Sequence, residues 1–252
     1  MRVAVVGGTG LVGRQTVEVL RTKGHEPVVV ARSTGVDVAT GDGLDAALQG
    51  AAAVVDVVSS ELTDRAAAEQ FFAAETENLL AAEQRAGVGH HVLLSIVGID
   101  AVEGNAHYAG KRVQEALVSA GAIPWTIVAA TQFFDFGAQV AGWTRSGDTA
   151  VVPPLLVQPV AVADVADVLA DVAVGKPLGR TIQVAGPETH DLVDMARRTL
   201  TARGDRVRLV ASWRESPLGV EMAGEVLLPD DGARIAPTTF ETWLARTAQE
   251  RG

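Results

Sequence analysis

The stretch that decides the fold runs from residue 2 to residue 13 and reads RVAVVGGTGLVG. Its first part, residues 2–6, is a short β-branched apolar run, which is typical of a buried strand. Residues 11–22 then place apolar side chains at helical spacing and end at Lys23-Gly24, which indicates a helix stopped by glycine. The glycines between these two segments therefore lie in a turn from a strand into a helix.

This turn matches both the G-x-x-G-x-x-G and the G-x-G-x-x-G patterns. Glycine allows the positive φ angles of a tight turn and lets the backbone approach a pyrophosphate, which rests on the free N–H groups of the helix N-terminus. A strand precedes the turn, a helix follows it, and a second strand comes about 20 residues later, so the pattern predicts a dinucleotide site. We expect the loop to contact the cofactor through Gly7, Thr9, Gly10, Leu11, Val12 and Gly13.

Strand-like and helix-like segments alternate along the first half of the chain. We expect strands at 27–31, 36–39, 53–58, 91–95 and 125–129, and helices at 44–49, 64–86 and 107–120. Such alternation requires crossover connections, and it predicts a doubly wound α/β Rossmann fold with helices on both faces of a parallel sheet. Residues 1–131 are expected to form this core.

The pattern loosens in residues 132–252. We expect residues 157–186 to return strands and a helix to the core, with Asp164 as the N-cap of a helix over 165–174 and a strand at 180–185. A helix at 190–203, an extended segment at 206–213 and a helix at 240–248 follow. The remainder is expected to form a small C-terminal substrate-binding lobe.

Composition argues against several classes of function. The chain has 252 residues with 21 Lys and Arg against 31 Asp and Glu, a formal net charge of −10, and it has no cysteine. This charge balance disfavours nucleic-acid binding, and the absent cysteines exclude disulfides. No apolar run approaches the ~20 residues that span a bilayer. We therefore expect a cytoplasmic protein with a small-molecule substrate, no membrane partner and no metal; a homodimer is left open.

The residues after the second strand bear on cofactor choice. An NAD site usually has a carboxylate there for the ribose 2′-hydroxyl, whereas this strand is followed by Arg32 and Ser33. A guanidinium and a hydroxyl suit a 2′-phosphate, which favours NADP(H) over NAD(H). We expect Asp42 to meet the adenine amine, and Ser59, after the strand at 53–58, to lie over the dinucleotide.

Together these motifs resemble the atypical branch of the short-chain dehydrogenase/reductase superfamily, and within it the NmrA-like NAD(P)-binding proteins. The likeness spans nearly the whole chain and is carried by GGTGLVG (7–13), TGDGL (40–44), LLSIVGI (93–99), KRVQE (111–115), ATQFFDF (130–136), VAGPE (184–188), LP (228–229) and FETWL (240–244). The resemblance implies a Rossmann sheet of six or seven strands and a lobe closing over the nicotinamide. It also implies hydride transfer to or from a carbonyl, enone, imine or quinone.

The resemblance further implies a catalytic Ser, a Tyr and a Lys four residues after the Tyr. Ser95 and Lys111 match, but the position four before Lys111 is His107, and Tyr108 is only three before it. Three alternatives follow. Either His107 is the acid, or Tyr108 is the acid, or neither acts as one. In the third case the chain either binds the dinucleotide without proton-relay catalysis or passes hydride to acceptors that need no acid from the protein. Lys111 is expected to bind the nicotinamide ribose under all three.

We also expect Thr131 to contact the cofactor. An aromatic group, Phe133, Phe134 and Trp143, either lines a hydrophobic substrate pocket or forms the core of the lobe. The sequence therefore favours an NADP(H)-binding oxidoreductase acting on a small hydrophobic carbonyl, enone or quinone. The alternative is a non-catalytic NADP(H)-sensing regulator of NmrA-like type that acts through a protein partner.

Overall fold

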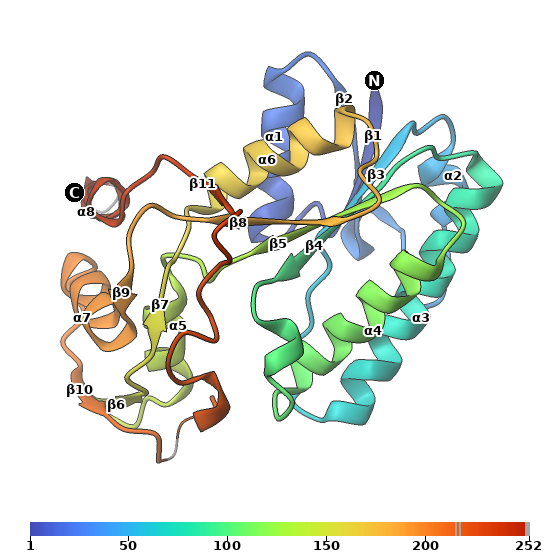
Figure 1. Ribbon diagram of the computed structural model, residues 1–252. Helices are drawn as coiled ribbons and strands as arrows, with labels where there is room; N and C mark the ends of the chain where they lie inside the picture. Colours follow the sequence, from blue (N-terminus) through green and yellow to red (C-terminus); the bar gives the residue numbers. More distant parts are fainter. Residues whose placement is uncertain (215, 217, 250–252) are drawn as a thin grey trace.

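A seven-stranded, wholly parallel sheet forms the centre of the protein in the computed structural model, which describes residues 1–214, 216 and 218–249 (Figure 1). The strand order is β11-β8-β5-β4-β3-β1-β2. The strands are β1 (Arg2–Val6), β2 (Glu26–Val30), β3 (Ala53–Asp56), β4 (His91–Ile96), β5 (Trp125–Ala130), β8 (Thr181–Ala185) and β11 (Arg234–Ile235). The expected doubly wound Rossmann fold is confirmed.

Helices cover both faces of this sheet. On one face lie α1 (Leu11–Thr22) and α6 (Val162–Val174); on the other lie α2 (Leu44–Leu48), α3 (Arg65–Ala86) and α4 (Ala106–Ala120) (Figure 1). In β1, Val3 and Val5 pack toward α1 and α6, whereas Ala4 and Val6 pack toward α2 and α3. Burial on both sides explains why the strand is apolar without alternation.

The order in which strands are added to the sheet reverses at β1, because β2 is added on one side of it and β3 on the other. In open α/β sheets a ligand binds in the crevice beyond the carboxyl ends of the strands at such a reversal. The loops that follow β1 and β3 therefore define where a dinucleotide is expected to lie.

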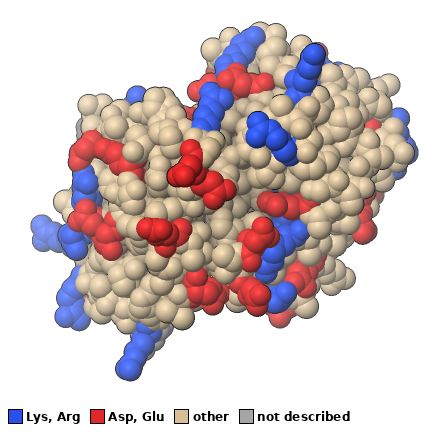
Figure 2. Space-filling view, viewed as in Figure 1, with Lys and Arg blue, Asp and Glu red and all other residues tan. Residues whose placement is uncertain are grey.

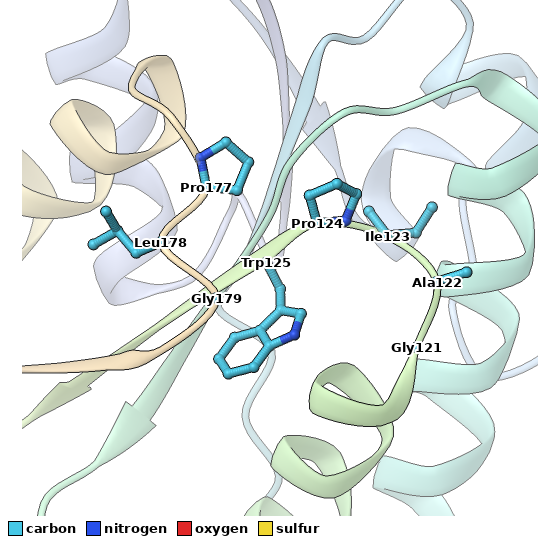
Figure 3. Close-up of a pocket in the computed structure, with 8 residues that line it drawn as sticks. All are labelled: Gly121, Ala122, Ile123, Pro124, Trp125, Pro177, Leu178 and Gly179. Atoms are coloured by element: carbon cyan, nitrogen blue, oxygen red, sulfur yellow. The ribbon is translucent and has the colours of Figure 1, made fainter.

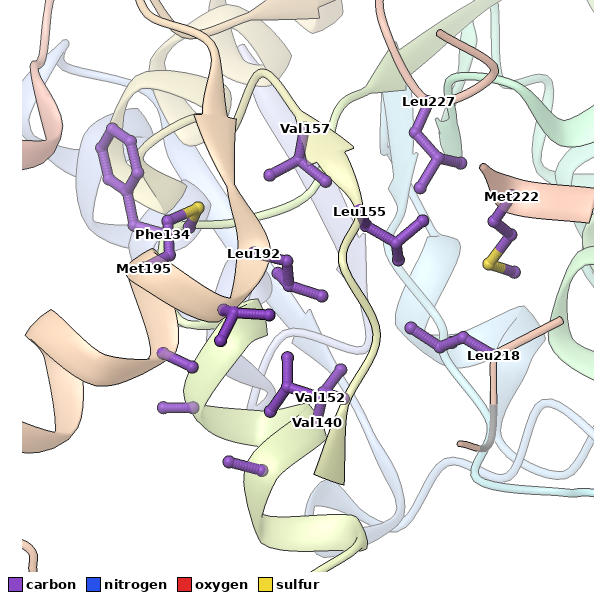
Figure 4. Packing of buried hydrophobic residues seen from close by; sticks show 14 of the residues in the cluster. Phe134, Val140, Val152, Leu155, Val157, Leu192, Met195, Leu218, Met222 and Leu227 are labelled. Atoms are coloured by element: carbon purple, nitrogen blue, oxygen red, sulfur yellow. The ribbon is translucent and has the colours of Figure 1, made fainter. Parts of the chain in front are cut away.

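The C-terminal half adds a lobe beside the sheet. Its elements are α5 (Phe136–Trp143), β6 (Thr149–Val152), β7 (Leu156–Val157), β9 (His190–Asp191), α7 (Leu192–Ala202), β10 (Arg208–Ala211) and α8 (Phe240–Gln249). Strand β6 pairs parallel with β10, and β7 pairs antiparallel with β9. Figure 4 shows the apolar packing of this lobe, in which Val140, Leu155 and Leu192 converge. We call this set of buried side chains the lobe cluster.

Two local expectations were wrong. Residues 36–39 do not form a strand: Asp37 and Asp42 make an isolated bridge, and Gly41 and Gly43 adopt φ values of +84° and +78° that turn the chain back. Asp164 does not cap α6, which begins at Val162. Its carboxylate instead accepts hydrogen bonds from the backbone N–H and the hydroxyl of Thr238, both at 3.0 Å.

The surface carries charges of both signs. On the face shown in Figure 2, acidic and basic side chains are interspersed, and no continuous basic field appears there. None of the described helices is long and apolar enough to cross a membrane.

Candidate functional site

The glycine loop after β1 has the geometry that a pyrophosphate requires. Gly7 adopts φ +77°, and its N–H donates to the Val30 carbonyl at 3.0 Å, which ties the loop to the end of β2. A Cβ on Gly13 would collide with the Gly7 carbonyl oxygen and lie 2.7 Å from the Gly8 Cα. Gly10 is the N-cap of α1 and offers no side-chain cap, so the first N–H groups of the helix remain free for a ligand.

A second loop, residues 57–60, forms the opposite wall. The Val57 carbonyl oxygen lies 3.1 Å from the position that a Gly7 Cβ would take. The loops after β1 and β3 therefore touch at the point where the strand order reverses. Ser59 on this loop is exposed, as are Thr9, Gly10 and Leu11 opposite it, whereas Val12 and Gly13 are buried beneath the glycine loop. The exposed members are available to a ligand.

The far end of the crevice is built by two turns. Arg32 and Ser33 are exposed on a single 3-10 turn, η1 (Arg32–Thr34). A Cβ on Gly43 would lie 2.8 Å from the Gly35 carbonyl oxygen, so the turn that carries Asp42 packs against the turn that carries Arg32. The residues expected to contact the adenosine part of the coenzyme, Arg32, Ser33 and Asp42, therefore lie on adjoining turns.

Asn78 holds this arrangement, a role that sequence reasoning missed. From α3, its side-chain amide donates to the carbonyl oxygens of Val38 and Ala39 at 3.0 and 2.9 Å. These carbonyls have no strand partner, so the Asn78 amide supplies the hydrogen bonds that a neighbouring strand would have supplied if residues 36–39 were a strand. The signal for this contact was an amide on a helix that is otherwise rich in alanine.

Lys111 lies in a network of buried polar side chains beneath the second loop. Its ammonium donates to the Gln114 side-chain oxygen, and the Gln114 amide donates to Asp56 at 2.7 Å and to Glu75 at 3.1 Å. Asp56 and Glu75 are 0% exposed and Lys111 is 3% exposed. We call these four residues, which come from β3, α3 and α4, the buried polar cluster.

The electrostatics of this cluster favour one neutral and one ionised carboxyl group. Burial raises the pKa of Glu75 well above its ordinary value, and the charge of Asp56 raises it further, against an opposing effect of Lys111. Burial also lowers the pKa of Lys111, against the attraction of the two carboxylates. We therefore expect Glu75 to hold a proton at neutral pH and Asp56 to balance the lysine. The other Asp56 oxygen accepts from the Val58 N–H at 2.9 Å, which fixes the start of the 57–60 loop.

The residues expected to form a proton relay have separate partners. Ser95 is buried on the side of β4 that faces α4, where it interacts with Glu115, and Tyr108 interacts with Gln132. Burial raises the pKa of Tyr108 to about 12. Lys111 donates its hydrogen bond to Gln114 instead, and among the described residues no hydrogen bond joins it to Ser95 or Tyr108. The catalytic roles of these residues stay predictions.

His107 faces the second loop rather than solvent. Its ring centroid lies 5.7 Å from that of Phe72, and it interacts with the backbone of Ser60. Burial, and then the charge of Lys111, lower the pKa of His107 to about 4. The imidazole is therefore neutral at physiological pH, and it can donate or accept a hydrogen bond but carries no ready proton for an acid role.

The expected aromatic pocket is spread over three places. Phe134 is buried in the lobe cluster, with its ring centroid 5.6 Å from that of Trp243, whereas Phe133 packs against the apolar side chains beneath α6. Trp143 is 60% exposed at the end of α5. Thr131 follows β5, and its hydroxyl donates to the Gln158 carbonyl at 2.6 Å. Substrate and cofactor contacts by these residues stay predictions.

Two surface cavities lie away from the crevice. Figure 3 shows one of about 460 Å³, lined by residues 121–125 and 177–179, where β5 begins. Because the strands are parallel, this is the edge of the sheet opposite the glycine loop. The other, of about 470 Å³, lies where β8 and β11 meet. Neither has the position of a dinucleotide site.

The comparisons with known proteins identify the family. The model of the NAD(P)H-binding family matches residues 7–175, which include the glycine loop and both walls of the crevice. The chain belongs to the NAD(P)H-binding family. The expected NAD(P)-binding family is confirmed by this match.

Solved structures share the fold over almost the full chain. An NADPH-dependent quinone oxidoreductase from Escherichia coli is 17% identical with a TM-score of 0.73, covering 97% of this chain and 99% of that one. A nucleoside-diphosphate-sugar epimerase from Staphylococcus aureus is 15% identical with a TM-score of 0.73, at 97% and 99% coverage.

A curated relative matches over a shorter stretch. The photosystem II assembly factor Ycf39 of Synechocystis is 33% identical over 111 residues, which cover 38% of this chain and 34% of that protein. The chain therefore matches about a third of the length of this relative.

Proposed function

We propose that this protein is an NADP(H)-dependent oxidoreductase that reduces small hydrophobic quinones, a class of acceptor that needs no proton from the protein. The observation that carries the proposal is the commitment of Lys111 to the buried polar cluster, which leaves Tyr108 without the lysine that would lower its pKa. A ketone becomes a strongly basic alkoxide and needs an acid beside it. A quinone becomes a weakly basic hydroquinone anion, which water can protonate.

The chain offers a binding role for each part of the coenzyme. The free backbone amides that follow the N-cap residue Gly10 fit the pyrophosphate, and the bare Gly13 lets α1 pack against the glycine loop, where a Cβ would meet the Gly7 carbonyl oxygen. The exposed side chains of Arg32 and Ser33 suit a 2′-phosphate. The bound nicotinamide would supply the hydride. The likeness to the E. coli quinone oxidoreductase supports the same class of reaction.

Turnover with matched acceptors tests the reaction class. Wild-type protein should oxidise NADPH in the presence of 1,4-naphthoquinone and should leave a ketone of similar size unreduced. Because neither side chain acts as an acid, Tyr108→Phe and His107→Asn should keep at least half of the quinone activity. Faster reduction of the ketone than of the quinone, or loss of quinone reduction in Tyr108→Phe, contradicts the proposal.

Binding measurements test the cofactor choice. A charge-assisted hydrogen bond contributes about 1.5–3 kcal/mol, so Arg32→Ala should weaken NADPH binding roughly 10- to 100-fold and leave NADH binding unchanged. Arg21→Ala is a matched control, because that arginine is exposed at the other end of α1. If calorimetry gives the same NADPH affinity for Arg32→Ala and wild type, the arginine does not read a 2′-phosphate.

The separated relay residues also favour a second candidate, a non-catalytic NADP(H) sensor that acts through a protein partner. It predicts no NADPH oxidation with any quinone, enone or carbonyl, together with clearly different affinities for the oxidised and reduced coenzyme. Quinone-dependent turnover rules it out.

A further inference from the structure

Gln132 is a buried amide whose hydrogen-bonding capacity is largely unused. It lies two residues after β5, and it is only 7% exposed. Neither the nitrogen nor the oxygen of its side chain makes a hydrogen bond of ordinary geometry with a described residue. Buried side-chain amides are paired in the large majority of native structures, and an exception at a ligand-binding edge points to a missing ligand group.

The backbone around Gln132 is fixed, so the amide is not an accident of a loose loop. The Gln132 carbonyl accepts from the Val160 N–H at 2.9 Å, and the Thr131 N–H donates to the Val184 carbonyl at 3.0 Å. The Phe134 N–H donates to the Val160 carbonyl at 3.2 Å. A side chain held on such a frame is suited to bind a ligand atom at a defined position.

The surroundings of the amide indicate the class of ligand. Gln132 lies at the carboxyl edge of the sheet, where cofactor and substrate are expected to meet. The Tyr108 hydroxyl interacts with it, and the Tyr108 ring belongs to the lobe cluster with Ile99 and Met222. A polar group at the border of an apolar region suits a ligand that has a hydrophobic body and a carbonyl oxygen.

We propose that the Gln132 amide nitrogen donates a hydrogen bond to the acceptor oxygen that becomes negatively charged during hydride transfer. This inference rests on the proposed quinone reductase function and assigns the residue that recognises the acceptor. One hydride, with two electrons, leaves the reduced coenzyme and joins the quinone, which becomes a hydroquinone monoanion. Gln132 keeps its proton and stabilises the oxyanion, and water supplies the proton that completes the hydroquinone.

Gln132→Leu tests the assignment, because leucine fills a similar volume without polar atoms. Removing one donor to a developing oxyanion should lower kcat/KM for 1,4-naphthoquinone roughly 100-fold. NADPH affinity should change less than twofold. The thermal midpoint should change little, since the Gln132 side chain makes no interaction with the described residues other than that with the Tyr108 hydroxyl.

A neighbouring glutamine provides the control for stability. Gln158 donates to the Gly186 carbonyl at 2.8 Å, so Gln158→Leu should lower the thermal midpoint. A much smaller loss of stability in Gln132→Leu than in Gln158→Leu distinguishes a binding amide from a structural one. Gln132→Met keeps a similar length but has no hydrogen-bond donor, and it should lose quinone activity as Gln132→Leu does.

Three outcomes overturn the inference. They are unchanged kcat/KM in Gln132→Leu, a thermal midpoint as low in that variant as in Gln158→Leu, and full activity in Gln132→Met. If wild type itself fails to oxidise NADPH with the quinone, the proposed function fails, and binding then tests Gln132 alone. Protein loaded with oxidised NADP should bind 1,4-naphthoquinone at least tenfold more tightly than loaded Gln132→Leu, and equal affinity or no binding by either also overturns the assignment.

Discussion

Replacing Lys111 with methionine removes the cation of the buried polar cluster and leaves Asp56 without a balancing charge. Methionine keeps the apolar volume of the lysine stem, so the change is mainly electrostatic. The Gln114 side-chain oxygen also loses its donor. Both Asp56 and Lys111 are almost completely inaccessible to water, so solvent cannot screen the remaining charge.

The expected loss follows from this burial. Lys111 and Asp56 are joined through Gln114 rather than in direct contact. Removing one of two such buried opposite charges should cost about 3–5 kcal/mol, as in a buried ion pair, because the other charge stays desolvated and uncompensated. For a chain of about 250 residues, 1 kcal/mol shifts the thermal midpoint by roughly 2–4 °C. We therefore expect Lys111→Met to lower the midpoint by roughly 10 °C.

A double variant isolates the charge interaction. In Lys111→Met combined with Asp56→Asn, the asparagine oxygen can still accept from the Val58 N–H. A flip of the Gln114 side-chain amide, whose oxygen the lysine has left, then lets that oxygen accept from the asparagine amide in place of the present bond from Gln114 to Asp56. The double variant should therefore recover at least half of the lost free energy of unfolding. NADPH affinity should recover too if Lys111 acts by holding the 57–60 loop, whereas a direct lysine contact with the ribose predicts no recovery.

Urea denaturation at pH 7.5, followed by circular dichroism, measures the three variants and wild type. The reasoning is refuted if Lys111→Met loses less than about 1 kcal/mol, or if the losses of the two single variants simply add in the double variant.

Two further predictions concern the cluster and the glycine loop. Because the pKa of Glu75 is raised in the folded protein, this carboxyl group ionises in the unfolded chain once the pH exceeds about 4.5, while the folded protein still holds it protonated. The free energy of unfolding of wild type therefore falls as the pH rises through this range. Glu75→Gln mimics the protonated form, and its stability relative to wild type should increase from pH 5 to pH 8; a constant difference in denaturation series contradicts this sign. Gly13→Ala should weaken NADPH binding at least tenfold by calorimetry, because the new Cβ meets the Gly7 carbonyl, whereas Gly142→Ala, with no atom within 4 Å, should bind normally.

The sheet could be predicted because its strands and helices differ in period along the chain. Residues 2–6 and 125–129 read as buried strands, and the structure has β1 and β5 there within one residue. The segment at 36–39 looked like a strand by composition alone. It turns instead because Gly41 and Gly43 favour left-handed backbone, and because the Asn78 side-chain amide donates hydrogen bonds to the backbone carbonyls of this segment. Local β-propensity did not include that long-range partner.

The site could be predicted only where a motif is continuous in sequence. The glycine loop is such a motif. The neighbours of Lys111 are not, since Asp56 and Glu75 come from other elements, and only the packing of α3 against α4 brings them together. Gln132 lies in the ATQFFDF stretch, but nothing in the sequence marks its amide as a binding group, because that depends on its burial and its few partners in the folded chain. The prediction that Asp164 caps α6 was wrong for a similar reason, because the residue that donates hydrogen bonds to it, Thr238, is far along the chain.

The chain passes several times between the sheet and the lobe, so neither part is formed by one continuous segment. It leaves the sheet after β5, returns for α6 and β8, departs again through β9 and β10, and ends the sheet with β11. Each passage is a covalent tether. Cutting the polypeptide near residue 131 would strip β8 from β5 and uncover a row of main-chain donors and acceptors, which is a template for aggregation. Dissection of this molecule into separately expressed halves should therefore yield insoluble fragments, and coenzyme-binding studies need both halves in one polypeptide.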